Sequence, residues 1–264
     1  MNLELSGRRA LVTGSTIGIG FAIAAELARE GARVILNGRK KESVVKAIER
    51  LRRLVSGADV AGCAADLSTA EGVVSLIDVH PEVDILVNNV GVFDPVPFES
   101  IPDSEWQRFF DVNVMSGVRL SRHYLPQMKS SGWGRIVFIS SESGINPPSE
   151  MVHYGMTKAA QLSISRGLAQ STTGTGVTVN AVLPGPTRSE GVVGFFAKLA
   201  AEQGISQAEM EQRFFAEARP TSILKRLIKP AEVAALVAYV CSTRASATNG
   251  AALRVEGGVV SSMC

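Results

Sequence analysis

Between Thr13 and Gly20 the chain reads TGSTIGIG, directly after the apolar run Arg9–Thr13 and before an amphipathic segment, Phe21–Glu30. Glycines at such a strand-to-helix turn let the backbone approach a pyrophosphate closely and let the helix pack tightly on the strand. The N-terminus of the helix adds free N–H groups and a positive dipole end. The stretch therefore predicts a dinucleotide-binding turn, although its glycines stand at offsets 0, 4 and 6 rather than in the GxGxxG pattern. Its expected cofactor-binding residues are Gly14, Ser15, Thr16, Gly18, Ile19 and Gly20.

Outward from this turn, short apolar runs alternate with amphipathic segments along the whole chain. Uninterrupted runs rich in Val, Ile and Leu are typical of parallel strands that are covered on both faces. The alternation predicts an α/β fold, a single doubly wound Rossmann-like domain over residues 1–264, with ligands outside the carboxyl ends of the strands. The expected strands are Arg9–Thr13, Arg33–Asn37, Val60–Ala64, Ile85–Val87, Arg135–Ser140, Val177–Val182 and Ala251–Val255. The expected helices include Phe21–Glu30, Lys41–Val55, Ser104–Lys129 and Val152–Thr172.

The composition is that of an ordinary globular protein. Hydrophobic residues make up 45% of the 264 residues, charged residues make up 20%, and the net charge of +2 is too small to indicate nucleic-acid binding. The three cysteines, Cys63, Cys241 and Cys264, are widely spaced, which argues against a disulfide framework or a metal site. Neither a signal peptide nor an apolar run of about 18 residues is found. We therefore expect a soluble cytoplasmic protein without a metal or a membrane partner.

The end of the second expected strand bears on the choice of dinucleotide. An NAD site usually carries an acidic residue about 20 residues past the glycines, but the sequence here continues from Gly38 to Arg39 and Lys40. Arg39 is able to bind a 2′-phosphate through two parallel hydrogen bonds, and Lys40 adds positive charge. The alternative is that both are simply exposed residues of the first helical turn. The pattern favours NADP(H), with NAD(H) as the less favoured cofactor.

Two further strand ends carry candidate cofactor-binding residues. Asp66 is a candidate acceptor for the adenine amino group, with Leu67 packing on the ring, but helix N-capping by Asp66 or Ser68 is an equally good interpretation. Asn89 is expected to fix the next turn by bonding backbone groups, and Gly91 would let the chain pass close to a ribose.

A tyrosine and a lysine, Tyr154 and Lys158, stand at i and i+4 and share one face of an expected helix. The cation is expected to lower the tyrosine pKa, so that the phenol works as an acid or base. Ser141, after the strand Arg135–Ser140, is the preferred partner for the substrate oxygen, with Ser140 and Ser143 as competitors. Asn113 lies within an expected helix, where asparagine is unfavourable. It is either a buried, hydrogen-bonded residue or a kink whose free carbonyl holds a water next to Lys158.

The segment after the sixth strand predicts a cofactor wall and a lid. Pro184 and Gly185 make a stiff turn that is expected to face the nicotinamide, with Thr187 bonding the carboxamide or the phosphates. Residues 188–228 are expected to form a substrate lid with hinges at glycines, and three residues near it are candidates for ordering a polar substrate. The hinge candidates are Gly191, Gly194 and Gly204, and the substrate candidates are Glu142, His153 and Arg188.

Taken together, these motifs resemble the short-chain dehydrogenase/reductase family over nearly the whole chain. The matching pieces are residues 13–20, Asn88-Asn89-Val90-Gly91, Asn113, Ser141, Tyr154 with Lys158, Pro184-Gly185 and Val255-Glu256-Gly257-Gly258. The resemblance implies a seven-stranded parallel sheet and a catalytic tetrad of Asn113, Ser141, Tyr154 and Lys158. In it, Tyr154 exchanges the proton, Ser141 orients the carbonyl, Lys158 lowers the tyrosine pKa and binds the nicotinamide ribose, and Asn113 sustains a proton relay.

The expected activity is hydride transfer between NADP(H) and a small carbonyl or secondary-alcohol substrate. A non-catalytic NADP(H)-binding regulator on the same fold is the first alternative, because fold does not fix function. An epimerase or dehydratase that retains its cofactor is the second. The resemblance further implies a homotetramer or homodimer that pairs through the helices holding Asn113 and Tyr154.

Overall fold

The computed structural model describes residues 2–263, so Met1 and Cys264 lie outside the described residues. A seven-stranded sheet runs through its centre in the order β3-β2-β1-β4-β5-β6-β7, and every neighbouring pair is parallel. This confirms the predicted doubly wound α/β fold and all seven expected strands. The strands are β1 (Arg9–Val12), β2 (Arg33–Gly38), β3 (Val60–Ala64), β4 (Ile85–Asn88), β5 (Gly134–Ile139), β6 (Val177–Pro184) and β7 (Ala252–Val255).

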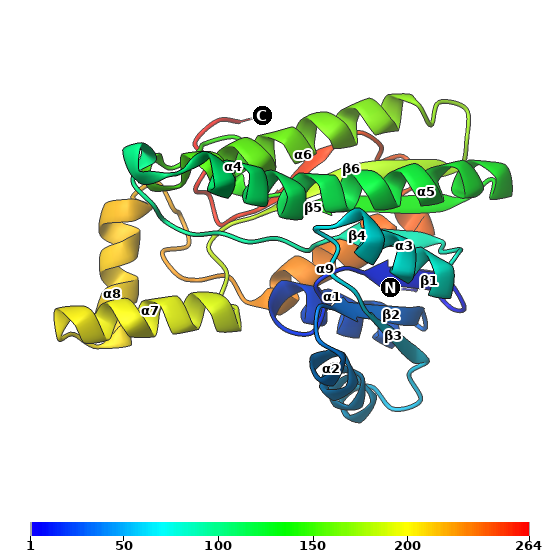
Figure 1. Cartoon of the computed structure of the whole chain (residues 1–264), viewed down its shortest axis with the longest axis horizontal. Helices are drawn as coiled ribbons and strands as arrows, with labels where there is room; N and C mark the ends of the chain where they lie inside the picture. Colours follow the sequence, from blue (N-terminus) through cyan, green and yellow to red (C-terminus); the bar gives the residue numbers. More distant parts are fainter. Residues whose placement is uncertain (1, 264) are drawn as a thin grey trace.

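Two layers of helices cover the sheet (Figure 1). On one face lie α1 (Gly18–Arg29), α2 (Lys41–Leu54) and α9 (Pro230–Cys241), whose apolar side chains form a core with β1 and β2. On the other face lie α3 (Ala70–Val79), α5 (Ser116–Ser131) and α6 (Val152–Gln170), which bury a second core against β4, β5 and β6. The two cores hold the sheet rigid, so the strand ends are fixed in position. No helix within residues 2–263 is long and apolar enough to cross a membrane.

The expected helix Ser104–Lys129 is divided into two helices by a wider turn. It consists of α4 (Asp103–Phe110), a π-helical turn η2 (Asp111–Met115) and α5, which follow one another without a gap. A π-turn inserts one extra residue into the helical hydrogen-bond pattern and often occurs at functional sites. Asn113 lies at its centre and is buried and hydrogen-bonded, which was the first of the two interpretations of this residue.

Short helices η1 (Phe98–Ser100), η3 (Glu142–Gly144), η4 (Ser149–Met151) and η6 (Thr243–Ala245) connect the main elements. The segment 188–228 contains α7 (Glu190–Gln203), α8 (Gln207–Arg213) and a π-turn η5 (Phe214–Ala218). In Figure 1, α7 and α8 stand apart from both helical layers, at the left of the molecule. They have a small core of their own, made of Phe196, Ala200, Met210, Phe215 and Leu227. We call residues 188–228 the lid.

The glycines of the lid do not occupy loop positions as expected of hinges. Gly191 and Gly194 lie inside α7, and Gly204 ends that helix with a left-handed φ of 65°. Helix formation from Glu190 onward removes the freedom that a hinge at Gly191 or Gly194 would need. The expectation of hinges at these two positions was therefore wrong, and Gly204 is a helix cap.

Candidate active site

The glycine-rich turn is packed too closely for larger side chains. Gly14 has a φ of +58°, and a Cβ there would lie 3.0 Å from Val90 Cα. A Cβ at Gly20 would overlap the Asn89 side-chain amide and lie 2.5 Å from Gly14 O. These glycines allow α1 to begin directly over the ends of β1 and β4, so its N-terminus faces the carboxyl ends of the strands.

Two polar side chains lock this turn to neighbouring strands. The Ser15 hydroxyl donates to Val12 O at 2.6 Å and accepts from Asn37 N–H at 3.0 Å. The Asn37 amide in turn accepts from Gly14 N–H at 3.2 Å and donates to Ala65 O at 3.2 Å. Ser15 is fully buried, so its hydroxyl is occupied inside the protein and the expectation that it contacts a cofactor is not supported. Asn37 is a structural residue that the sequence reading missed.

Asn89 fixes the next strand end as expected. Its side-chain amide donates to Thr13 O at 2.8 Å and to Gly14 O at 3.0 Å. The Thr13 hydroxyl accepts from Asn89 N–H and Val90 N–H, both at 2.9 Å. The ends of β1 and β4 are therefore tied together beneath the glycine-rich turn, and Gly91 continues into the cavity described below.

The candidates for the adenosine end lie at the ends of β2 and β3. Arg39 and Lys40 are exposed directly after β2. This strand end lies beside the glycine-rich turn, as a Cβ at Gly38 would be only 2.6 Å from Thr16 Cγ2. Asp66 accepts from the amide N–H and the hydroxyl of Ser68, at 3.1 and 2.7 Å.

The N-cap of α3 differs from both expected residues. Thr69, not Asp66 or Ser68, caps α3 by accepting from Gly72 N–H at 3.0 Å. Leu67 is 2% exposed within the second core, so its side chain is not available to an adenine ring. That expectation was wrong because Leu67 faces inward from the strand end.

A cavity of about 450 Å³ opens at the carboxyl ends of β4, β5 and β6, under the lid. Most of its wall is apolar, and α7 and η5 contribute Val192, Phe195, Phe196, Leu199 and Phe214. Its polar residues include Asn89, Ser141, Glu142, Tyr154, Lys158, Thr187 and Arg219. The predicted turn residues Pro184 and Gly185 also line it, together with Ile19 and Gly91. Three of the four expected tetrad residues and nearly half of the expected cofactor-binding residues therefore line one space.

The hydroxyl, phenol and ammonium groups expected to carry the chemistry meet in this cavity. Ser141 follows β5, while Tyr154 and Lys158 come from the first turns of α6. Lys158 Nζ lies 5.5 Å from the centre of the Tyr154 ring and donates to Ile139 O at 2.9 Å. The competitor Ser140 donates its hydroxyl to Lys158 O at 2.8 Å, and the Ser143 amide donates to Ser141 Oγ at 3.1 Å. The bond to Lys158 O engages the Ser140 hydroxyl, whereas the Ser143 contact involves its backbone N–H, so the Ser143 hydroxyl remains a competitor of Ser141.

The protonation of this group depends on its burial and on Glu142. Burial raises the pKa of the Tyr154 phenol, and the nearby Glu142 carboxylate raises it further. Burial lowers the pKa of the Lys158 ammonium to about 7, while Glu142 acts in the opposite direction. A hydrogen bond with Ser141 acts to lower the Tyr154 pKa, whereas Lys158 directs its ammonium to Ile139 O; the expected lowering of the tyrosine pKa by Lys158 stays a prediction. Tyr154 is held in its protonated form.

Asn113 is connected to Lys158 by a side chain. Gln161 donates to Asn113 O at 2.6 Å and accepts from Lys158 Nζ at 3.2 Å. The Asn113 side chain accepts from Val92 N–H at 2.8 Å and donates to Thr157 Oγ1 at 3.0 Å. The expected free carbonyl is therefore engaged by Gln161, which stands where the sequence analysis placed a water.

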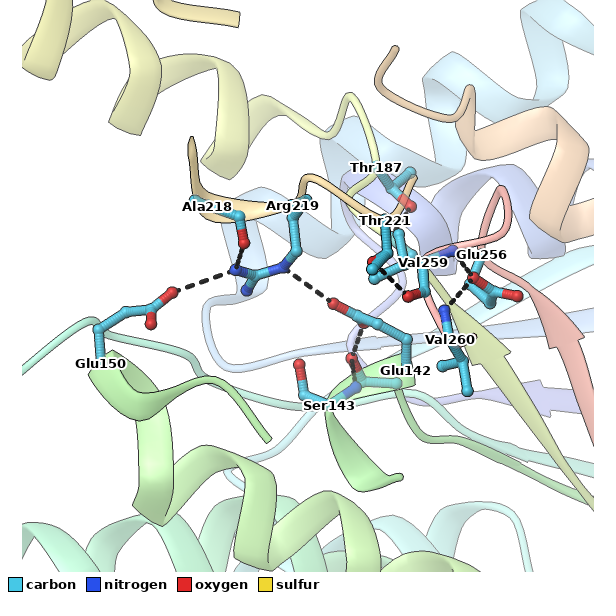
Figure 2. Close-up of polar contacts among 12 residues, drawn as sticks. Glu142, Ser143, Glu150, Thr187, Ala218, Arg219, Thr221, Glu256, Val259 and Val260 are labelled. Carbon is cyan, nitrogen blue, oxygen red and sulfur yellow. Dashed lines mark hydrogen bonds and ion pairs between the residues drawn. The ribbon is translucent and has the colours of Figure 1, made fainter. Parts of the chain in front are cut away.

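A buried charged group bridges the cavity between its floor and the lid (Figure 2). Glu142 is 5% exposed and accepts a short hydrogen bond from the Ser141 hydroxyl. Its other oxygen lies 3.6 Å from Arg219 Nε, and Arg219 Nη1 lies 3.2 Å from Glu150. Glu142 was among the expected substrate candidates, but Arg219 and Glu150 were missed, because a lone arginine after a helix carries no distinctive sequence signal.

The other two substrate candidates point elsewhere. His153 is fully buried, with its ring centre 4.0 Å from that of Phe109 and 5.9 Å from that of Trp106. Arg188 forms an ion pair with Glu211 within the lid. Neither lines the cavity, so Glu142 alone of the three is placed to meet a substrate.

The turn after β6 connects the cavity wall to the lid. The Thr187 hydroxyl donates to Gly185 O at 2.8 Å, and Thr187 is 4% exposed within the wall. Ser189 lines the cavity and caps α7 by accepting from Val192 N–H. Glu190 then accepts from Gly18 N–H at 2.8 Å and lies 3.5 Å from Arg50 Nη1. The sequence analysis missed Ser189 and Glu190, which bring the lid against the glycine-rich turn.

The residues present fit a bound nicotinamide dinucleotide. At Gly91 a Cβ would lie 3.4 Å from Asn113 Oδ1 and 3.6 Å from Lys158 Nζ, so a side chain there would fill the space beside the lysine. At the N-terminus of α1, the position where phosphates bind through backbone N–H groups, the Gly18 N–H already donates to a carboxylate, that of Glu190. Gly14, Gly18, Gly91 and Lys158 would hold the dinucleotide.

The chain is similar to known dehydrogenases and reductases. The family model described as short chain dehydrogenase matches residues 8–199. The uncharacterized oxidoreductase YvaG of Bacillus subtilis is 52% identical, with all of both chains covered. The D-beta-hydroxybutyrate dehydrogenase of Cupriavidus necator is 31% identical over 97% of this chain and 99% of that protein. The structure of L-sorbose reductase from Gluconobacter frateurii, complexed with NADPH and L-sorbose, superposes with a TM-score of 0.94 at 31% identity, and both chains are covered completely.

Proposed function

The chain belongs to the short-chain dehydrogenase/reductase family of oxidoreductases, and from this premise we propose that it reduces the carbonyl group of a small molecule with NADPH. The observation that carries the proposal is the meeting of Ser141, Tyr154 and Lys158 in one cavity beside the glycine-rich turn. A bound NADPH would supply the hydride to the carbonyl carbon. The residues of the chain would bind, orient and protonate.

Tyr154 is the proton donor in this proposal. Its O–H bond breaks as the carbonyl oxygen gains the proton, and the carbon that has accepted the hydride becomes an alcohol carbon. The phenol then regains a proton from solvent, so hydride and proton together account for both atoms added. Burial and Glu142 raise the pKa of Tyr154, so at neutral pH the phenol carries the proton that reduction consumes.

The other three residues support that transfer. Ser141 would hold the carbonyl oxygen next to the phenol, and Lys158 would bind the nicotinamide ribose beside Gly91. Asn113 holds the loop at Val92 and contacts Lys158 through Gln161. Arg39 and Lys40 would favour NADP(H) over NAD(H), since they are exposed at the adenosine end and their charges suit a 2′-phosphate. Thr16, Asp66 and Thr187 are proposed as further cofactor contacts.

The lid and the assembly complete the proposal. The lid would close the cavity over the substrate, because its aromatic side chains form much of the wall. Family membership favours a homodimer or homotetramer, paired through the helical segments that hold Asn113 and Tyr154, that works in the cytoplasm. Relatives do not fix the substrate: one is a dehydrogenase of an anionic hydroxy acid, and one structural neighbour binds a neutral sugar.

The test compares the parent with Tyr154→Phe in an NADPH-oxidation assay over a panel of ketones, keto acids and ketoses. The variant keeps the ring but loses the proton, so kcat/KM should fall about 10²–10⁴-fold, the usual contribution of a general acid. Tyr239→Phe is the matched control, since Tyr239 lies on α9 outside the cavity. Undiminished reduction by Tyr154→Phe would exclude this mechanism. Turnover of a substrate without net NADPH oxidation would point to an epimerase or dehydratase.

A further inference from the structure

We propose that Glu142 and Arg219 form a subsite for a hydroxyl group next to the reacting carbonyl, so that the substrate is a neutral hydroxyketone rather than a keto acid. The inference rests on the proposed function and names the substrate class of the same cavity. The charged groups of Glu142 and Arg219 are buried in a cavity whose wall is mostly apolar.

The position of the pair places it against the reacting atoms. Glu142 directly follows Ser141, and its carboxylate accepts the Ser141 hydroxyl. Arg219 reaches it from the lid, after η5, as Figure 2 shows. Each side chain is 9% exposed or less. Buried charges are costly to desolvate unless other groups compensate them, so a pair in the substrate cavity requires polar groups around it.

The polar groups of the protein do not supply every hydrogen bond that Glu142 and Arg219 are able to form. The Glu142 oxygen nearest Arg219 is 3.6 Å from Nε, beyond hydrogen-bonding distance. Arg219 Nη1 donates to Glu150 and to Ala218 O, at 3.2 and 2.7 Å. Within residues 2–263, no hydrogen bond is formed by Arg219 Nη2. An acceptor and a donor therefore stand side by side at the wall of the cavity.

A hydroxyl group is able to bind both the Glu142 acceptor and the Arg219 donor. It donates one hydrogen bond and accepts others, whereas a carboxylate only accepts and a methyl group does neither. A substrate hydroxyl beside the carbonyl can donate to Glu142 and accept from Arg219. Since Glu142 is next to Ser141 in the chain, a group that meets Glu142 lies next to the group that meets Ser141.

The local charge argues against a keto acid. Two carboxylates, Glu142 and Glu150, flank the single guanidinium of Arg219 at 3.6 and 3.2 Å. Lys158 is the only other cationic residue of the cavity wall within residues 2–263, and its amine is directed to Ile139 O and Gln161. Around Arg219, where two carboxylates meet one guanidinium, a substrate carboxylate would be repelled. A neutral polar substrate meets no such repulsion.

The contact with Ser141 links recognition to the reaction rate. While Ser141 donates to Glu142, its proton is not available to a substrate carbonyl. A substrate hydroxyl that donates to Glu142 instead releases the Ser141 proton for the carbonyl oxygen. The hydroxyl should therefore raise kcat as well as lower KM, because part of its effect acts on the transition state.

The experiment measures kcat and KM for NADPH-dependent reduction of hydroxyacetone, butanone and pyruvate, which differ at one position beside the carbonyl. For the parent we expect kcat/KM for hydroxyacetone to exceed that for butanone about a hundredfold, with part of the difference in kcat, because a site built for a hydroxyl rejects analogues that lack it. Pyruvate should be the poorest substrate. A ketose such as L-sorbose extends the panel to larger hydroxyketones.

Three variants separate recognition from structure. Glu142→Leu should lower the ratio of kcat/KM for hydroxyacetone to kcat/KM for butanone about tenfold or more. Comparing this ratio between the variant and the parent also cancels the different intrinsic reactivity of the two ketones. Glu142→Gln keeps an acceptor but loses the charge, so pyruvate should improve relative to butanone. Glu217→Gln is the matched control: Glu217 belongs to η5, near Arg219, but is 72% exposed and lies outside the cavity wall. Its substrate ratios should equal those of the parent.

The outcomes distinguish this inference from the proposed function. If the parent reduces butanone or pyruvate as well as hydroxyacetone, the subsite is wrong while the reductase proposal stands. If Glu142→Leu lowers kcat/KM by the same factor for all three substrates, Glu142 has only a structural role and the inference is overturned. If no ketone, keto acid or ketose is reduced, both proposals fail. The parent panel decides even if a variant does not fold.

Discussion

The floor of the cavity and its lid are built on different physical principles. In the floor, Gly14 and Gly20 touch the neighbouring strand end so closely that an added Cβ would meet backbone atoms at 3.0 and 2.5 Å. In the lid, a Cβ at Gly191, Gly194 or Gly204 would meet nothing within 4 Å. The floor is fixed by backbone contacts, which tolerate little change. Around α7 and α8 the lid is held by its own small apolar core and by a few side chains, and backbone bonds hold its C-terminal end.

This difference suggests a division of labour. The rigid floor positions Tyr154, Lys158 and the cofactor turn, which the chemistry requires in a fixed geometry. The C-terminal end of the lid is joined to the rest of the domain by backbone bonds, such as those from Ile223 and Leu224 N–H to Gly257 O. Over the cavity the lid meets the floor through polar side-chain contacts, chiefly Glu190 with Gly18 N–H and Arg219 with Glu142. Such contacts can be exchanged for contacts with ligands, so substrate and cofactor are able to compete for them.

The largest expected effect comes from adding one methyl group to a glycine of each region. Gly20→Ala should lower the free energy of unfolding by about 3 kcal/mol, since its Cβ would overlap Asn89 and lie close to Gly14 O. Gly194→Ala should raise it by about 0.5–1 kcal/mol, because alanine is the better helix former and the space is open. Urea denaturation of both variants measures the difference. Equal effects would contradict the contrast between floor and lid.

The next effect concerns the edge of the floor. Arg39→Ala should weaken NADPH binding about 10–100-fold, the equivalent of one or two charge-assisted hydrogen bonds, and leave NADH binding nearly unchanged. Fluorescence titration with both cofactors measures it. Arg53→Ala, an exposed arginine of α2, is the control for net charge. A loss of equal size for both cofactors would show that Arg39 does not read the 2′-phosphate.

The same contrast explains what the sequence could predict. Mostly apolar runs located every strand of the sheet to within two residues, and the glycine-rich turn marked the carboxyl ends of the strands, where the cavity opens. These features are local, since a few adjacent residues determine them. The unfavourable helical propensity of Asn113 also indicated the break in its helix.

What escaped prediction depends on contacts between distant segments. Gln161 reaches Asn113 O across 48 positions of sequence, and Glu190 reaches Gly18 across 172. Arg219 meets Glu142 because the lid folds back over β5. No local pattern distinguishes these residues from ordinary helix or loop residues. The predicted cofactor contacts of the Leu67 and Ser15 side chains are not supported for a related reason, since a strand-end position does not reveal whether a side chain faces inward.

Gln161 offers a test within the floor through pH. Burial lowers the pKa of Lys158 to about 7, so the ammonium is lost as pH rises above that value. Reduction should then show a falling alkaline limb in kcat/KM. Gln161→Leu removes an acceptor of the ammonium and should lower the pKa, so that the limb moves about one unit to lower pH. Gln161→Glu adds an anion and should move it to higher pH.

The pair of variants controls for lost packing, since leucine and glutamate have similar size. Both lose the donor to Asn113 O, so any effect of that bond is common to the two. The position of the limb is compared, not the maximal rate. Displacement of both limbs in the same direction, or of neither, would mean that Lys158 does not govern the alkaline limb.

The smallest effect tests where lid and floor meet. Glu190 accepts from Gly18 N–H at 2.8 Å, at the helix N-terminus where a phosphate would approach. If the carboxylate competes with phosphate, Glu190→Gln should strengthen NADPH binding about threefold, because it removes a negative charge worth less than about 1 kcal/mol at a helix end. Glu202→Gln is the control, since Glu202 lies on the same helix and is 55% exposed.

The sign of this effect decides between two views of the lid. Tighter NADPH binding by Glu190→Gln means that the carboxylate holds the place of the phosphate and must leave as the cofactor binds. Weaker binding means that the bond to Gly18 and the ion pair with Arg50, at 3.5 Å, order the turn for the cofactor. High salt separates the two, because screening reduces a repulsion between charges more than it reduces a backbone hydrogen bond. A gain that disappears at high salt would establish competition between lid and cofactor.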